Sequence, residues 1–231
     1  MSECYAGFLG ECDGGISREH YISKKVLDVL ALGGTLNVAQ QTAGKVHYEY
    51  TSGVETVAAA KVLCKKHNSF LSALDSHAGD FFTSVYHCTR GGIQGLIDFS
   101  QFKTDLSGRL IEKWLLKMAC GAIASGSWGG GHRMIPQEWV RVLFGFSPWP
   151  EYFNLYSSEK TEYCVPEGNH ARVDFRRDPS NSILQGVTCV FMPLDLTLVL
   201  GPYHGVPGLK RPSDFIYKSS EREITIKLSW V

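Results

Sequence analysis

The positions of the cysteines constrain the fold of this 231-residue chain more than any other feature. Seven Cys, an odd number, are spread over the whole length, unlike the dense, even sets of small disulfide-linked domains. Cys64 and His67 are three residues apart at the start of a predicted helix, which puts a thiol and an imidazole on one side of its first turn. Two more ligands would complete a tetrahedron, and Cys4 and Cys12 are the only upstream cysteines. The sequence therefore predicts a structural Zn site of the Cys3His type, formed by Cys4, Cys12, Cys64 and His67.

Periodic patterns around these residues predict the local elements. Residues 45–51 alternate with β-formers and predict a strand, while residues 57–63 fit either a second strand or the start of a helix. From Cys64 onward, apolar residues recur at steps of three and four, which predicts a helix with one buried stripe. That stripe comprises Phe70, Leu71, Leu74, Ala78 and Phe81.

The pattern divides the chain into three segments, 1–84, 85–147 and 148–231. The middle segment is predicted to be helical, with an apolar stripe between Leu106 and Met118, a cap at Thr104, Asp105 or Ser107, and a stop at Gly121. The last segment is rich in β-formers at 182–192, 194–200 and 223–230, and the final run alternates strictly. The predicted fold class is α+β, with an antiparallel sheet packed on the helices. The remaining cysteines are predicted to be buried thiols: Cys88, Cys120, Cys164 and Cys189.

Composition limits the partners and the location that we expect. Hydrophobic residues make up 44% and charged residues 20%, which is typical of a globular protein and excludes a disordered or coiled-coil chain. Lys plus Arg and Asp plus Glu both total 23, so the whole molecule has no long-range attraction for polyanions, and any such site must be a local patch. Without an apolar run near 18 residues or a signal-like N-terminus, the sequence predicts a soluble cytoplasmic protein that does not bind membranes.

Two short motifs are associated with the predicted Zn site: Ile16-Ser-Arg-Glu-His20 follows Cys12, and Cys64-Lys-Lys-His-Asn68 contains the ligands Cys64 and His67. In this order they resemble the HNH endonucleases of the ββα-metal class, over the N-terminal third of the chain. In that family an acidic residue that binds the catalytic metal precedes the His that acts as general base. The residue after the second zinc ligand also binds the catalytic metal. The resemblance implies these roles for Glu19, His20 and Asn68, with His67 replacing the commoner Cys.

The resemblance implies a ββα-metal module in residues 1–84 and an enzyme, an HNH-type endonuclease that hydrolyses phosphodiester bonds of DNA. The chemistry agrees, because a neutral imidazole such as that of His20 takes a proton from water, and a hard cation such as Mg or Mn prefers oxygen ligands such as those of Glu19 and Asn68. A local positive patch for the phosphates is predicted at Lys24, Lys25, Lys65 and Lys66. DNA is the expected partner, RNA is not excluded, and the sequence leaves a homodimer open.

The motifs also differ from the family in two respects. The family's middle Asn, which braces the loop that carries the catalytic His, has no counterpart between residues 54 and 63, and the distance from His20 to Cys64 requires an insertion around residues 29–43. Two other hypotheses therefore stay open. One is a non-catalytic zinc-stabilised module that binds nucleic acid or protein, and the other is a protein whose function lies in residues 85–231.

Overall fold

A computed structural model describes most of the chain and shows a mixed α+β protein, as predicted. The described residues are 4–31, 36–42, 45–51, 58–88, 103–127, 134–158, 162–163, 171–177, 184–191, 194–201, 208–218 and 223–230. The N-terminal elements are η1 (Gly7–Leu9), β1 (Ile16–His20), α1 (Lys24–Leu30), β2 (Leu36–Thr42), β3 (Lys45–Thr51), β4 (Ala59–Cys64) and α2 (Lys65–Tyr86). The middle elements are β5 (Asp105–Ser107), α4 (Gly108–Ser125) and α5 (Gln137–Leu143). The C-terminal strands are β6 (Asn154–Ser157), β7 (Glu162–Tyr163), β8 (Ala171–Arg177), β9 (Leu184–Phe191), β10 (Leu194–Val199), β11 (Leu209–Lys210), β12 (Asp214–Lys218) and β13 (Glu223–Ser229).

The N-terminal part contains a ββα unit whose two strands are far apart in sequence. Strand β1 pairs antiparallel with β4, with Ile16 opposite Cys64 and His20 opposite Ala59, and β4 continues directly into α2. Helix α1 and the antiparallel β2–β3 hairpin are inserted between β1 and β4. The strand predicted at 45–51 and the insertion predicted near 29–43 are therefore confirmed, and residues 59–64 form a strand rather than a helix start.

Helix α2 follows its predicted stripe with one exception. Leu71, Leu74, Ala78 and Phe81 are buried, but Phe70 is 63% exposed and stacks on the ring of Phe144, with 5.3 Å between the ring centroids. Phe70 directly precedes Leu71, so the helical rotation of about 100° per residue turns it away from the core. The prediction that Phe70 belongs to the buried stripe is wrong.

Helix α4 is the central buried helix, and it is longer than predicted. Ser107 caps its start by accepting a hydrogen bond from the Leu110 amide at 3.3 Å. The predicted stop at Gly121 is wrong, because the helix continues to Ser125 and ends at Gly126 in the left-handed conformation. Gly121 has a packing role instead, since a Cβ there would lie only 2.3 Å from the Cβ of Tyr21.

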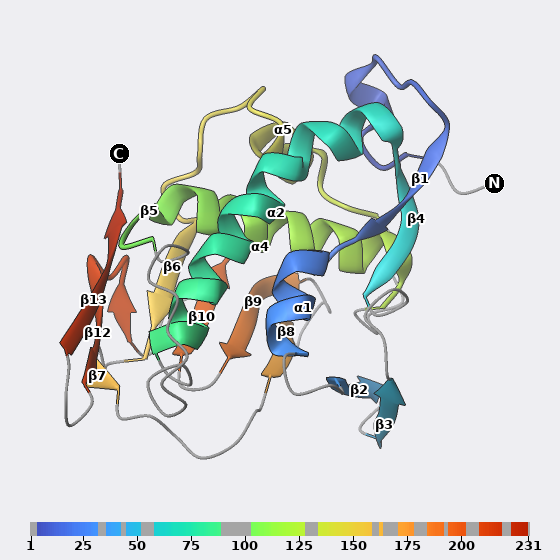
Figure 1. Ribbon diagram of the computed structural model, residues 1–231. Helices are drawn as coiled ribbons and strands as arrows, with labels where there is room; N and C mark the ends of the chain where they lie inside the picture. Colours follow the sequence, from blue (N-terminus) through green and yellow to red (C-terminus); the bar gives the residue numbers. More distant parts are fainter. Residues whose placement is uncertain are drawn as a thin grey trace.

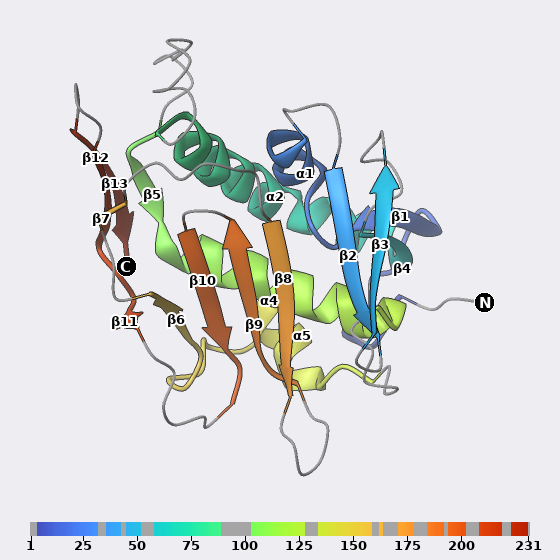
Figure 2. The ribbon, with the colours of Figure 1, turned by 90° about the horizontal axis from the view of Figure 1, so that it is seen from below.

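The C-terminal strands form two sheets that pack on the helices. One has the antiparallel order β11-β6-β10-β9-β8, and the other has the order β5-β13-β12-β7, in which β5 runs parallel to β13. Figures 1 and 2 show α4 lying between α2 and the larger sheet. Buried residues of all three segments join in one hydrophobic core, which includes Leu71, Trp114 and Leu196.

Among the described helices, none combines the length and the apolarity that crossing a membrane requires.

The cysteines outside the predicted Zn site behave as expected where the structure describes them. Cys88, Cys120 and Cys189 are buried, whereas Cys164 lies outside the described residues. Burial raises the pKa of the Cys88 thiol to about 12, so it stays protonated at neutral pH. These thiols pack as small apolar groups in the core.

Candidate metal centre and the end of strand β1

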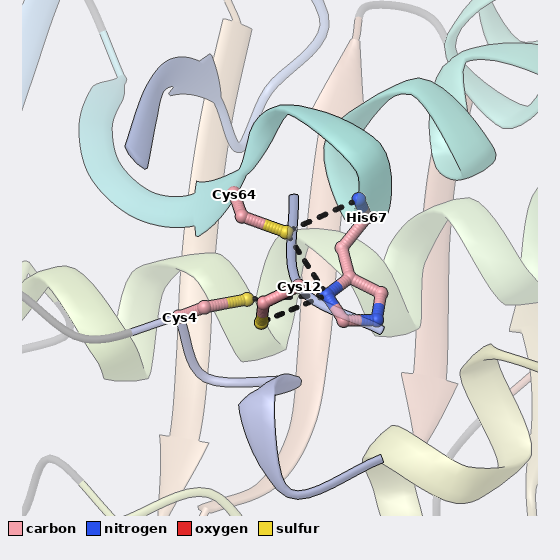
Figure 3. Close-up of side chains that lie close together, drawn as sticks. All are labelled: Cys4, Cys12, Cys64 and His67. Atoms are coloured by element: carbon pink, nitrogen blue, oxygen red, sulfur yellow. Dashed lines mark hydrogen bonds between the residues drawn. The ribbon is translucent and has the colours of Figure 1, made fainter. Parts of the chain in front are cut away.

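Cys4, Cys12, Cys64 and His67 converge at one end of the ββα unit, and their ligand atoms all lie within 4.8 Å of one another. In Figure 3 the three thiols point toward the imidazole of His67, which projects from the first turn of α2. The Nδ1 atom of His67 lies 3.2 Å from the Sγ of Cys64, 3.3 Å from that of Cys4 and 3.7 Å from that of Cys12. The structure thus brings together the four residues that the sequence predicted as metal ligands.

Backbone hydrogen bonds hold the N-terminal segment against the start of α2. The Tyr5 amide donates to the Val62 carbonyl at 3.0 Å, and the Lys65 amide donates to the Gly15 carbonyl at 2.9 Å. Gly14 and Gly15 both have positive φ, near 70°, which residues with a side chain rarely adopt. This turn directs the chain from Cys12 into β1, so Cys12 and Cys64 meet although about fifty residues separate them.

The geometry fits a tetrahedral zinc ion. With Zn–S bonds of about 2.3 Å and Zn–N bonds of about 2.0 Å, a tetrahedral site requires sulfur to nitrogen distances of roughly 3.6 Å. The three distances to the Nδ1 atom of His67 lie between 3.2 and 3.7 Å. Three soft thiolates and one imidazole are also the donor set that zinc prefers. The cluster could therefore hold a metal such as zinc, as predicted.

Before a metal ion binds, the pKa shifts in the cluster favour coordination at His67 and Cys64 but not at Cys4. Burial lowers the pKa of His67, and the nearby Lys66 adds to this effect, so the imidazole is neutral and its lone pair is free to coordinate. Burial raises the pKa of Cys4 to about 12. Burial also acts to raise the pKa of Cys64, but hydrogen bonds from the backbone and from the neighbouring thiols more than offset it, and the pKa falls below 9.0. Of the cluster's thiols, Cys64 is thus the one whose pKa the fold lowers, which favours its deprotonation.

The other end of β1 carries the predicted catalytic pair. His20 is the last residue of the strand and is partly buried, whereas the Glu19 side chain is 1% exposed. The Glu19 Oε1 atom lies 3.2 Å from the Nζ of Lys117, a fully buried lysine of α4. Lys117 also lies 2.7 Å from both carboxylate oxygens of Asp75 in α2. Glu19 is thus part of a buried ionic group rather than of an open cleft.

Asn68 lies at the opposite end of the unit, in the first turn of α2 beside His67 of the cluster, and is partly buried. Asp75, whose carboxylate shares Lys117 with Glu19, follows seven residues later, about 10 Å along the helix axis. A cation bound by Glu19 would also lie close to the Lys117 ammonium, which repels it. The geometry therefore gives no support to a catalytic Mg or Mn ion on Glu19 and Asn68, and these roles stay predictions.

The predicted lysine patch is largely neutralised by local acidic partners. Lys24 pairs with Asp28 at 3.0 Å, Lys25 with Asp80 at 2.5 Å and Lys66 with Glu11 at 2.7 Å. The side chain of Lys65 packs over Gly14, where a Cβ would lie 2.9 Å from the lysine Cβ. Each lysine is exposed, but the patch is less positive than its sequence suggests.

Sequence reasoning missed Lys117 and Asp75. Both lie on predicted helices, but Lys117 is next to Met118 in an apolar stripe, where a charged residue is expected on the solvated face. It is instead fully buried. Its burial could have been suspected from its neighbours, because Lys117 follows three apolar residues, Trp114 to Leu116, and precedes Met118.

Comparison with protein families, with curated proteins and with solved structures found no match for this chain. The resemblance of residues 1–84 to the HNH endonucleases consequently rests on the two motifs and stays a prediction. What the molecule itself shows is a ββα unit with a Cys3His cluster that could hold zinc.

Proposed function

We propose that the N-terminal unit is a zinc-stabilised endonuclease module that hydrolyses phosphodiester bonds of DNA with His20 as general base. The observation that supports this proposal best is the position of His20 in the unit. It lies at the end of β1, four residues and about 13 Å along the strand from Ile16, which is paired with the zinc ligand Cys64. The zinc cluster thus fixes one end of the strand that carries the proposed base.

The chemistry assigned to His20 is proton transfer. An imidazole takes a proton from water at neutral pH, which makes the water a nucleophile toward phosphorus. A divalent cation such as Mg or Mn would supply neutralising charge at the phosphate, but the geometry does not support a site for it on Glu19 and Asn68. We assign no step to Glu19, because its carboxylate is paired with Lys117.

A plasmid-nicking assay on the zinc-loaded protein tests the proposal. We expect nicking that requires Mg or Mn, and we expect His20→Ala to reduce it by about a hundred- to ten-thousandfold, as loss of a general base does. His87→Gln, at the far end of α2, is the matched control and should leave the rate unchanged. The proposal fails if neither DNA nor RNA is cut under any metal condition, or if His20→Ala cuts at the normal rate.

A second candidate function is a non-catalytic module that uses the zinc-stabilised fold to bind a protein or a nucleic acid. Two observations favour it: Glu19 is already neutralised by Lys117, and large apolar side chains are exposed near the cluster. Phe70 is 63%, Phe146 64% and Met134 89% exposed, and Met134 lines a groove of about 980 Å³ beside the three cysteines. This candidate predicts full zinc binding, no nicking and loss of partner binding in Phe146→Ser.

A further inference from the structure

The buried ammonium group of Lys117 connects three separate parts of the molecule. It reaches Asp75 of α2 at 2.7 Å, Glu19 of β1 at 3.2 Å and the backbone carbonyl of His20 at 3.5 Å. An ammonium group has three N–H donors, and here they go to the two Asp75 oxygens and the His20 carbonyl, whereas Glu19 contributes an ion pair. Lys117 itself comes from α4, so three elements meet at one nitrogen atom.

We propose that Lys117 is a positioning residue, which holds the end of strand β1 and thereby sets the place of His20. The proposal rests on the proposed function, because it gives the reason for the position of the proposed base. Lys117 is fully buried and therefore does not touch a substrate itself. It acts on the reaction only by holding the end of β1, where it contacts the backbone of His20 and the side chain of Glu19.

The packing of α4 supports this role. Gly121 lies one turn after Lys117 on the same face of the helix, and it allows Tyr21 to contact the helix backbone closely. A Cβ at Gly121 would lie 2.3 Å from the Tyr21 Cβ and 3.4 Å from its Cα. Lys117 and Gly121 thus contact three consecutive residues, Glu19, His20 and Tyr21, at the point where β1 ends.

The choice of a lysine at this position also requires an explanation. Burying a charge is costly unless it is paired, and an apolar residue of similar size often stabilises a core as well or better. Glu19 and Asp75 supply the pairing charges. The His20 carbonyl is an additional partner, to which an apolar residue could not donate a hydrogen bond.

Amide hydrogen exchange in the zinc-loaded, full-length protein tests the contact without relying on activity. The Tyr21 amide donates to the Ala58 carbonyl at 2.8 Å, so its exchange reports whether the end of β1 stays closed. We expect Lys117→Met to raise exchange in the peptide that covers residues 16–22 by about tenfold or more. Glu112→Gln is the matched control, because Glu112 is also fully buried on α4 but bonds Arg211 and the Leu155 amide instead. Equal exchange in the two variants would overturn the proposal.

A second variant covers the case in which Lys117→Met does not fold. Combining Lys117→Met with Glu19→Gln and Asp75→Asn removes all three charges, so no buried charge is left unpaired. If Lys117 holds the strand end, exchange in residues 16–22 stays raised in this variant. If exchange returns to the wild-type level, Lys117 only compensates the two carboxylates and the proposal is wrong.

The nicking assay separates positioning from stability. We expect Lys117→Met to lower nicking by about a hundredfold, as a misplaced base does, but to cause no further loss in a His20→Ala background. Multiplicative losses in the double variant would contradict an action through His20. If the wild-type protein does not nick at all, the proposed function fails, while hydrogen exchange still decides whether Lys117 holds the end of β1.

Discussion

Each end of strand β1 brings together groups that favour a cation, but the cation has a different source at each end. At the Cys64 end, three thiols and an imidazole converge, and a cation that suits them has to come from solution. At the His20 end, Glu19 and Asp75 converge, and their cation is the side chain of Lys117. We therefore expect the stability of the first end to depend on metal supply, whereas the cation of the second end is part of the chain. Four predictions test this contrast, from the largest expected effect to the smallest.

The largest effect is expected at the metal end. Structural zinc contributes roughly 10 to 16 kcal/mol of binding free energy in small zinc sites, so Cys64→Ser or prolonged chelation should unfold the N-terminal unit. Elemental analysis and a thermal melt measure this, with Cys88→Ala as a control that removes a buried thiol outside the cluster. A folded protein that contains no zinc would show that the cluster is not a metal site.

The next effect is expected at the lysine end. Lys117→Met leaves the buried Glu19 and the partly buried Asp75 without their cation, which should lower the free energy of unfolding by about 3 to 5 kcal/mol. Urea titration measures the loss, and chelators should neither add to it nor mimic it. If adding Glu19→Gln and Asp75→Asn recovers none of the loss, the three charges do not stabilise one another as described.

The pH dependence of stability should have opposite signs at two carboxylates of α2. Burial raises the pKa of Asp75 above its ordinary 3.8, although Lys117 and His20 offset part of this. The stability that protonated Asp75 contributes is present below pH 3.8 and is lost as pH rises through the raised pKa. The wild-type protein should therefore lose stability over that pH range, and Asp75→Asn should abolish this loss.

Asp80 provides the opposite case. Burial acts to raise its pKa, but hydrogen bonds from Lys103 and Lys25 hold it below 3.8. Its contribution is present above 3.8 and is lost as pH falls through the lowered value, so Asp80→Asn should reduce stability most at neutral pH. Denaturant midpoints between pH 3 and 7 compare the variants, and slopes of the same sign would refute the contrast.

The smallest effect is expected for an exposed ion pair beside the metal cluster. Lys66 lies 2.7 Å from Glu11, but both groups are exposed and screened by water. Lys66→Ala should change the Tm by about one degree or less and leave the zinc content at one ion. A large loss of zinc would mean that this pair holds the Cys12 segment in place.

The contrast also explains what the sequence could predict. Cys64 and His67 are neighbours on one helical turn, which predicts one half of the site. Cys4 and Cys12 could be predicted as the other two ligands because they are the only cysteines before Cys64. The strand at 45–51, the last strand and the α+β class likewise depend on local periodicity. Such features are encoded within a few residues, so a single sequence reveals them.

The Lys117 group could not be predicted in this way, because its members come from three distant segments. Glu19, Asp75 and Lys117 are each ordinary charged residues, and only tertiary packing shows that they share one nitrogen atom. Gly121 looked like a helix stop for the same reason, since the chain that contacts it is a hundred residues earlier. Phe70 and Leu71 are adjacent in sequence, and only the helix rotation decides which of them is buried.

The insertion between β1 and β4 has a consequence for how this protein tolerates changes in length. A metal ion that joins Cys12 to Cys64 closes a loop of about fifty residues, and the entropy of closing a loop grows only logarithmically with its length. Doubling the loop costs only about 0.6 kcal/mol more, so its length has little influence on whether the unit closes. We therefore expect the closed unit to tolerate added or lost sequence in the segment that carries the β2–β3 hairpin.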